Sequence, residues 1–125
     1  MINRIRLTSV WVNDQDIAYD FYVNKLGFSV QSDVSIDNGY RWLEVKPEGA
    51  DTAIAIAKPY PGQEMPIGVF ANITFGTDDI QASYEDLRNK GVHFTEAPAR
   101  QLWGGMQALF TDPDGNTFVL VERED

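Results

Sequence analysis

The sequence predicts an α+β fold built from two tandem βαβββ modules. The first observation behind this prediction is an internal repeat, because residues 14–28 and 78–94 both contain an acidic start, an amphipathic helical stretch and a glycine before an aromatic residue. The second is a repeated turn, in which Pro, an acid and Gly precede an apolar run in residues 46–57 and again in 112–121. The third is the order of strand-like runs, which is the same around both helices.

The two predicted helices follow from the spacing of apolar residues. Ala18, Phe21, Tyr22 and Leu26 lie at positions i, i+3, i+4 and i+8, and Ile80, Tyr84 and Leu87 lie at i, i+4 and i+7. Both spacings give one apolar stripe that packs against a sheet.

Both helices also carry signals for their ends. Asp14 or Asp16 begins the first helix, and Thr77 or Asp78 begins the second, because side-chain oxygens at a helix start accept from free backbone N–H groups. Gly27 and Gly91 suit the left-handed residue that follows a helix.

Strand-like runs surround each helix in the order strand, helix, strand, strand, strand. They are residues 6–12, 28–34, 40–45, 52–57, 68–75, 92–95, 106–110 and 117–121. The segment 58–66 is rich in Pro and Gly and is predicted to link module 1, residues 1–58, to module 2, residues 67–125. We expect the 125 residues to form one domain.

Composition excludes several classes of function. The chain has no cysteine, which rules out disulfides, thiolate metal sites and a cysteine nucleophile and fits a reducing, cytoplasmic location. The formal net charge of −9 argues against nucleic acid and anionic membrane surfaces as partners. The acidity serves either solubility or the attraction of a cationic ligand. The sequence contains no phosphate-binding glycine loop and no nucleophile elbow. We expect no signal peptide and no membrane span.

Three stretches together resemble one known family. VNDQDIAYDFYVNKLGF (12–28), ITFGTDDIQASYEDLRNKGVHF (73–94) and FTDPDGNTFVLVE (110–122) are similar in order and spacing to the vicinal oxygen chelate superfamily of glyoxalases and bleomycin-resistance proteins. The resemblance implies two modules that form a half-open, curved mixed sheet with its site on the concave side. It also implies a homodimer.

The resemblance also identifies the positions where metal-dependent members hold a divalent ion. In this chain those positions are Leu7, Ala55, Asn72 and Val119. Three of these side chains are hydrocarbon, and only Asn72 offers an oxygen. We therefore expect no metal and no cofactor, provided that the strand alignment is not displaced by one residue.

Strand alternation predicts the side chains that line the concave face. If Leu7 points inward, Ser9 and Trp11 do as well, and Ala55 and its alternate neighbours Ala53 and Ala57 leave room above the sheet. The predicted ligand-binding residues are Ser9, Trp11, Trp42, Glu44, Ala55, Asn72, Thr74, Trp103 and Val119. Such an apolar, aromatic face suits a small organic ligand.

Glu44 is the one candidate catalytic residue, because it interrupts an otherwise apolar strand. If it is buried, it needs a partner such as Arg41 or Arg100. It then acts either as a member of a structural ion pair or as a general base or counter-charge for a cationic ligand. His93, the single histidine, is expected to be an exposed strand residue.

Trp103 lies in RQLWGGMQALFTDPDGN (100–116), which is similar to the loop and strand of bleomycin-resistance proteins that hold a flat part of the drug. The indole either stacks on a ligand or seals a dimer interface. Gly104 and Gly105 are expected to let a ligand or a second subunit approach the backbone.

Three hypotheses of function remain at this point. The first is a metal-free homodimer that binds a small planar or cationic molecule in the cleft between the modules. The second is a metal-dependent lyase, isomerase or dioxygenase of the same superfamily. The third is a dimerisation domain without a small ligand, since fold alone does not fix function.

Overall fold

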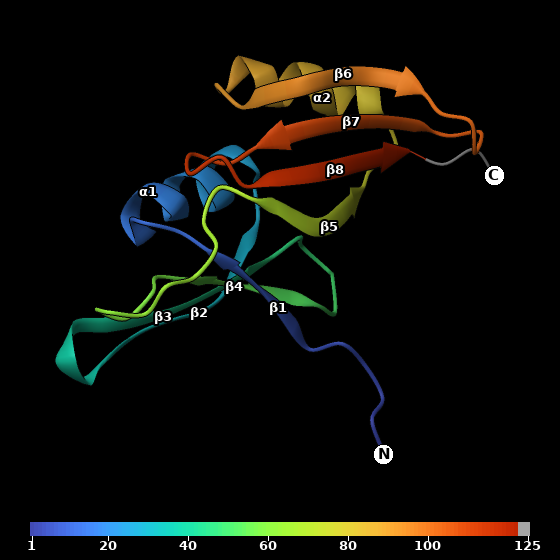
Figure 1. Cartoon of the computed structure of the whole chain (residues 1–125). Coiled ribbons are helices and arrows are strands. Elements are labelled where there is room, and N and C mark those ends of the chain that lie inside the picture. Colours follow the sequence, from blue (N-terminus) through green and yellow to red (C-terminus); the bar gives the residue numbers. More distant parts are fainter. Residues whose placement is uncertain (123–125) are drawn as a thin grey trace. The chain divides into compact units, whose positions relative to one another are not determined.

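The computed structural model describes residues 1–122, apart from the side chain of residue 37. The chain forms two compact units, Met1–Ile67 and Gly68–Asp125 (Figure 1). The first unit ends directly after the Pro- and Gly-rich segment 58–66.

Unit 1 is a four-stranded mixed sheet with a helix on one face. Its elements are β1 (Leu7–Trp11), α1 (Gln15–Tyr19), the π-helix η1 (Asp20–Lys25), β2 (Ser29–Ile36), the 3₁₀ turn η2 (Asp37–Gly39), β3 (Tyr40–Lys46) and β4 (Ala53–Ala57). The strand order is β1-β4-β3-β2, with β1 parallel to β4 and the other pairs antiparallel.

Unit 2 repeats this arrangement. Its elements are β5 (Phe70–Gly76), α2 (Ile80–Asn89), β6 (His93–Arg100), β7 (Met106–Thr111) and β8 (Thr117–Glu122). The strand order β5-β8-β7-β6 has the same pattern of one parallel and two antiparallel pairs. The predicted fold class, two βαβββ modules with mixed sheets, is confirmed.

The helix ends follow local hydrogen bonding. Asp14 begins α1, and its side chain accepts from the backbone N–H groups of Asp16 and Ile17. The prediction for α2 is wrong by one or two residues, because Asp79 is the cap and accepts from Ala82. Thr77, one of the two predicted caps, instead places its hydroxyl 2.7 Å from the Ser83 hydroxyl. Gly27 and Gly91 adopt positive φ values, as predicted.

The helix of unit 1 widens into a π-helix, which the apolar spacing did not predict. The N–H of Leu26 donates to the carbonyl of Phe21, five residues earlier. Phe21 and Tyr22 lie in this π-helical stretch, and both are buried.

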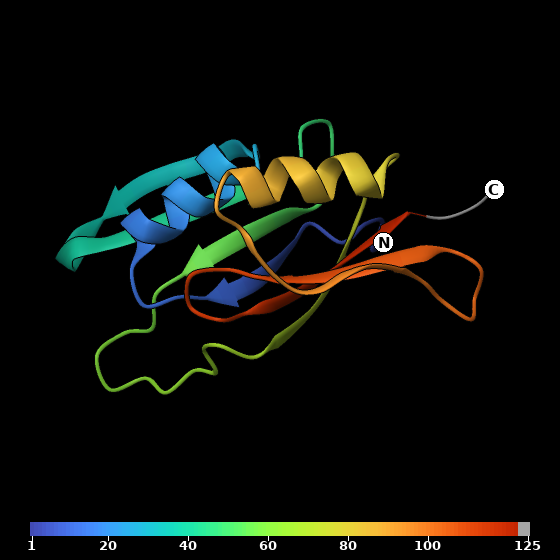
Figure 2. The ribbon, with the colours of Figure 1, turned by 90° about the horizontal axis from the view of Figure 1, so that it is seen from above.

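The core of unit 1 lies between its helix and one face of its sheet (Figure 2). Val10, Ile54, Ile56, Leu43 and Val45 are all at most 3% exposed. They alternate along their strands with the residues of the opposite face, as the strand period predicts. One face of the sheet thus packs against the helix. The opposite face, called the free face below because the helix of unit 1 lies on the other side, carries Ala53, Ala55 and Glu44, each at most 4% exposed.

The core of unit 2 is aromatic. Phe75, Phe94, Phe110 and Phe118 form a connected cluster, with ring centroids between 5.3 and 6.1 Å apart in the contacting pairs. Tyr84 of α2 meets Phe94 edge to face at 4.8 Å. These contacts fix α2 on its sheet.

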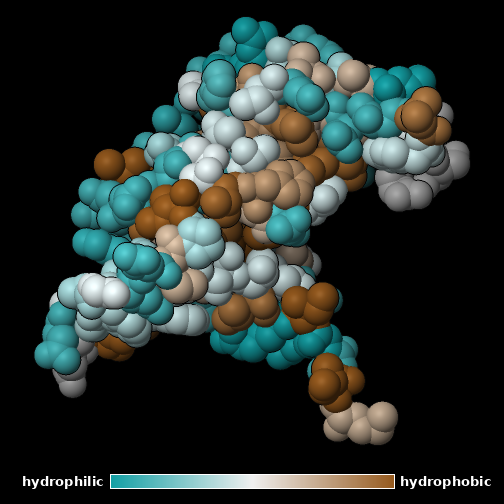
Figure 3. Space-filling view, viewed as in Figure 1, coloured by the Kyte–Doolittle hydropathy of each residue, from teal (hydrophilic) through white to brown (hydrophobic). Residues whose placement is uncertain are grey.

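Residues 1–6 precede the first strand and place no side chain in the core. Met1, Ile2 and Ile5 are strongly exposed, and apolar side chains are visible at this end of the chain, at the lower right of Figure 3. Within residues 1–122, no helix is long and apolar enough to cross a membrane.

Candidate ligand-binding site

The free face of the unit 1 sheet brings most of the predicted residues of that unit together. The register pairs Leu7 with Ala53, Ser9 with Ala55 and Trp11 with Ala57, so these six side chains share one face. Ala55 also pairs with Glu44, which pairs with Ser32. Trp42, two residues before Glu44, lies on the same face. The predicted grouping of these residues agrees with the register, while their role in ligand binding stays a prediction.

A cavity of about 90 Å³ lies on this part of unit 1. Trp11, Trp42 and Tyr60 contribute aromatic rings to its walls, and Ala55 and Ala57 line it with small side chains. Trp42 is 41% exposed and Tyr60 is 52% exposed, so both rings are accessible. Flat apolar groups can stack on such rings.

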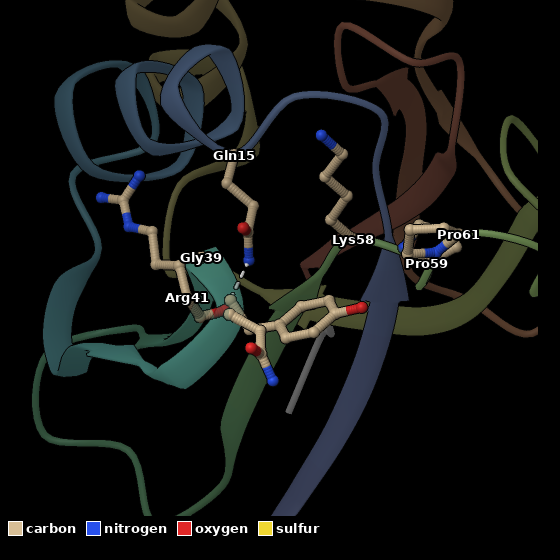
Figure 4. Close-up of a pocket in the computed structure, with 8 residues that line it drawn as sticks. Gln15, Gly39, Arg41, Lys58, Pro59 and Pro61 are labelled. Atoms are coloured by element: carbon tan, nitrogen blue, oxygen red, sulfur yellow. Dashed lines mark hydrogen bonds between the residues drawn. The ribbon is translucent and has the colours of Figure 1, made fainter.

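A second cavity, of about 340 Å³, adjoins the first (Figure 4). The two cavities share Tyr40, Arg41 and Lys58 as lining residues. The larger one is more polar and is also lined by Gln15, Asn38, Gly39, Pro59 and Pro61. Together the cavities offer an aromatic end and a polar end, a combination typical of small-molecule sites.

Gln15 fixes the wall of the larger cavity. Its side-chain amide donates to the carbonyls of Arg41 at 3.0 Å and Ile56 at 2.9 Å, and thus joins the start of α1 to β3 and β4. The first residue of α2 is the buried Ile80, which packs in the core instead. The polar residue at this helix start therefore distinguishes unit 1 from unit 2.

Arg41 is held by two carboxylates. It makes two 2.8 Å hydrogen bonds to Asp33, through Nε and Nη2, and its Nη1 lies 2.8 Å from Asp16. The hydrogen bond from Arg41 lowers the pKa of Asp33 below its usual range, and Asp33 in turn raises the pKa of Arg41. The Arg41 guanidinium also lies over the Tyr19 ring, 5.5 Å from its centroid. All of its nitrogens thus have carboxylate partners.

Glu44 is buried, at 2% exposure, and its partners differ from the expected ones. Its Oε2 accepts from the Trp42 indole at 2.5 Å and from Arg6 Nη2 at 3.3 Å. In the described part of the chain, no group donates a hydrogen bond to its Oε1.

The prediction that Arg41 or Arg100 pairs with Glu44 is wrong for a simple reason. Arg41 stands an odd number of residues from Glu44 on β3, so its side chain leaves the opposite face of the sheet and meets Asp16 of α1. Arg100 lies in unit 2 and donates to the carbonyl of Gly104. Arg6 reaches Glu44 because only the small side chains of β4 stand between them.

The predicted residues of unit 2 lie on its sheet and the loop before β7. Val119 pairs with Thr74 and with Leu109, and Thr74 is exposed. Asn72 is also exposed, but it has a left-handed backbone with φ 58° at a shift in the register of β5. Strict alternation along β5 therefore does not hold, because a bulge there adds residues without partners on β8.

Trp103 is 48% exposed, and its ring covers the Cα of Gly105. A Cβ on Gly105 would lie 2.0 Å from this ring, so the absence of a side chain there makes room for the chain's own indole. The expectation that Gly105 admits a ligand or a second subunit is therefore corrected. Gly104 has open space around its Cα and a φ of 99°.

The metal positions of the resemblance do not fit a divalent ion. Leu7, Ala55 and Val119 offer no ligand atom, and an amide oxygen at Asn72 alone is a poor site. Within the described residues, no three His, Cys, Asp or Glu side chains cluster in a way that could hold a metal. His93 is an exposed residue at the start of β6, as expected.

Several cavity residues were missed by the sequence analysis. Lys58 and Tyr60 belong to the segment interpreted only as a linker, and Tyr40 and Gln15 were not singled out. Tyr40 contacts Tyr60 edge to face at 4.2 Å, which joins that segment to β3. Tyr60 gave no clear signal in the sequence, because single exposed apolar residues are common on protein surfaces.

Comparison with known proteins agrees with this fold. The family model described as the glyoxalase/bleomycin resistance protein/dioxygenase superfamily matches residues 2–120. The chain belongs to this superfamily.

Relatives within the superfamily cover almost the whole chain. A superfamily member from Sphaerobacter thermophilus is 40% identical, with a TM-score of 0.89 over 98% of both chains. TnmS3, an antibiotic binding protein from a Streptomyces species, is 38% identical, with a TM-score of 0.85 over 98% of both chains. The uncharacterised protein YetH of Bacillus subtilis is 37% identical over 98% of this chain and all of its own length.

Proposed function

We propose that this superfamily member binds a small, flat organic molecule on the free face of the unit 1 sheet, without a metal ion. The observation that carries the proposal is the cavity lined by Trp11, Trp42 and Tyr60 beside the small residues Ala55 and Ala57. Indole rings stack on planar molecules, and alanines leave space for them above the sheet.

The hydrogen bond from Trp42 to Glu44 supports the proposal, because it preorganises the indole ring for ligand binding. Because Glu44 accepts from its indole nitrogen, the ring is held in one orientation before a ligand arrives. A side chain that is already ordered loses less conformational entropy on binding. The antibiotic binding protein TnmS3 shares 38% of its residues with this chain, which makes an organic ligand a reasonable expectation here.

We propose that no metal ion is bound, because three of the four side chains at the superfamily's metal positions lack ligand atoms. The aliphatic residues Leu7, Ala55 and Val119 cannot coordinate zinc, nickel, manganese or iron. Metal analysis of the purified protein, followed by titration with these four ions, tests this part. Stoichiometric binding at micromolar affinity would contradict it and favour a lyase, isomerase or dioxygenase.

The binding experiment uses a neutral flat probe, naphthalene carboxamide, in a calorimetric titration. Trp42→Ala should weaken binding about tenfold, because it removes the stacking surface. Ile17→Ala is the matched control, since Ile17 is an exposed apolar residue of unit 1 that lines neither cavity. Equal affinities for both variants and the native protein would refute this site.

A further inference from the structure

We infer that the ligand carries an anionic or strongly hydrogen-bond-accepting group, and that Lys58 binds this group. The inference rests on the proposed function and adds a chemical class to the ligand. It differs from the cationic ligand that the net charge of −9 suggested.

Lys58 stands where the two cavities meet. It follows the last residue of β4 and lines both the aromatic cavity and the larger polar one. Figure 4 shows its side chain rising beside Gln15, while the guanidinium of Arg41 is turned away from it. A ligand ring in the aromatic cavity can therefore direct a substituent toward the ammonium group.

The charges around the cavities leave Lys58 as the group available to a ligand. Arg41 is neutralised by Asp33 and Asp16. Glu44, whose Oε2 is paired with Arg6, is 2% exposed and lines neither cavity. Among the described side chains of residues 1–122, which do not include that of residue 37, Lys58 has no ion-pair partner. A ligand cation would be repelled by Lys58, whereas a carboxylate or phenolate would be attracted.

The acidity of the whole chain does not decide the sign of the ligand charge. At physiological ionic strength, charges separated by more than about 8 Å are largely screened. Contacts within the cavity act at shorter range. There the ammonium of Lys58 dominates, since it has no ion-pair partner among the described side chains. The net charge therefore sets the long-range field, while Lys58 sets the preference at the site.

The backbone keeps Lys58 at this position. Pro59 follows it directly, and a residue before proline is restricted to extended conformations. Pro61 fixes a further φ angle in the same segment. The backbone that carries the lysine is therefore constrained, which reduces the backbone entropy lost on binding.

Three probes of equal ring size test the inference: naphthalene carboxylate, naphthalene carboxamide and naphthalene methylammonium. Calorimetric titration of the native protein at pH 7 should give the tightest binding for the carboxylate and the weakest for the ammonium compound. We expect the carboxylate to bind about fivefold more tightly than the neutral amide, since a partly exposed ion pair contributes up to about 1 kcal/mol.

Lys58→Met should remove the preference for the carboxylate and leave the amide affinity unchanged. Lys58→Glu should reverse the order, with the ammonium compound binding most tightly. Lys46→Met is the matched control, because Lys46 lies at the far end of β3 and lines neither cavity.

The outcomes separate this inference from the proposed function. In one outcome the amide binds, Trp42→Ala weakens that binding, and Lys58→Met keeps the charge preference of the native protein. Lys58 then does not select the ligand, and the inference is wrong while the proposed function stands. If none of the three probes binds the native protein, the proposed site and the inference both fail. Loss of the preference in Lys58→Met and its retention in Lys46→Met supports both.

Discussion

The Trp42 indole donates a hydrogen bond to Glu44, two residues later on the same face of β3, and Arg6 pairs with the same carboxylate oxygen. One buried acid thus orients an aromatic ring of the candidate site and anchors the residue before β1. The ring and the acid are adjacent because side chains two residues apart in a strand share a face.

The ion pair between Arg6 and Glu44 should respond unequally to the loss of each partner. Arg6→Met leaves a carboxylate that is 2% exposed without its counter-charge, and we expect it to cost about 2 kcal/mol of unfolding free energy. Glu44→Gln leaves an arginine whose side chain is 60% exposed and well hydrated, so its cost should be about 1 kcal/mol or less.

Urea unfolding at pH 7 measures both values, and Arg4→Met is the control, because Arg4 is exposed and takes part in neither cavity. Equal losses of unfolding free energy in Arg6→Met and Glu44→Gln would show that the burial of Glu44 does not determine the cost of breaking the ion pair.

The contact between Asp33 and Arg41 predicts that the free energy of unfolding depends on pH. The hydrogen bond lowers the pKa of Asp33 in the folded protein. The ionised Asp33 therefore contributes its full stabilisation of the fold above the unfolded pKa of about 3.9, and this stabilisation is lost as the pH falls through the lower folded pKa. Asp33→Asn should therefore reduce stability at pH 7, by less than about 1 kcal/mol for this partly exposed pair.

Urea unfolding of the native protein and Asp33→Asn between pH 7 and pH 2 tests this dependence. The difference between them should shrink at the acidic end. Asp20→Asn is the control, because Asp20 forms no ion pair within the described residues. A difference that stays constant down to pH 2 would contradict the assignment.

Gly105 should be intolerant of a side chain because of Trp103. A methyl group on Gly105 would lie 2.0 Å from the indole and 2.8 Å from the backbone oxygen of Glu122. Gly105→Ala should therefore displace the ring and cost about 1–3 kcal/mol, the usual range for overpacking. Gly76→Ala is the control, since its Cβ would meet nothing within 4 Å. Thermal unfolding and tryptophan emission measure the two effects, and equal stability of both variants would refute the contact.

Substitution of Trp103 tests whether its indole contributes to ligand binding or to a dimer interface. We expect the native 14.1 kDa chain to form a homodimer. Because Trp103 lines neither cavity, Trp103→Ala should leave the affinity for naphthalene carboxamide unchanged. Light scattering after size exclusion gives the mass, and calorimetry gives the affinity. A fall to the mass of one chain with unchanged affinity would assign Trp103 to the dimer interface, whereas a weakened affinity would contradict a site confined to unit 1.

The repeat and the periodicities were sufficient to predict the order of elements in both units. Apolar spacing identified the helices that bury Phe21 and Ile80, and alternation placed Ile54 and Ile56 in the core and Ala55 on the free face. These predictions succeed because a strand's period of two and a helix's period of 3.6 are set by local backbone geometry.

The sequence was less informative about contacts between distant residues. It assigned Glu44 to Arg41 or Arg100 because both are cations, whereas Arg6 reaches Glu44 across β4. It treated residues 58–66 as a connection, whereas Lys58 and Tyr60 line the cavities. It also could not foresee the bulge at Asn72, since register depends on the partner strand.

The sequence by itself determined the fold class and the two modules, because local patterns repeat in each half, and its resemblance to the superfamily indicated the family. Only the tertiary structure decided which side chains meet: that Glu44 holds Trp42 and Arg6, that Gly105 lies under Trp103, and that Lys58 stands between two cavities. The physical reason is that strand order brings together residues far apart in the chain, and no local period encodes that order.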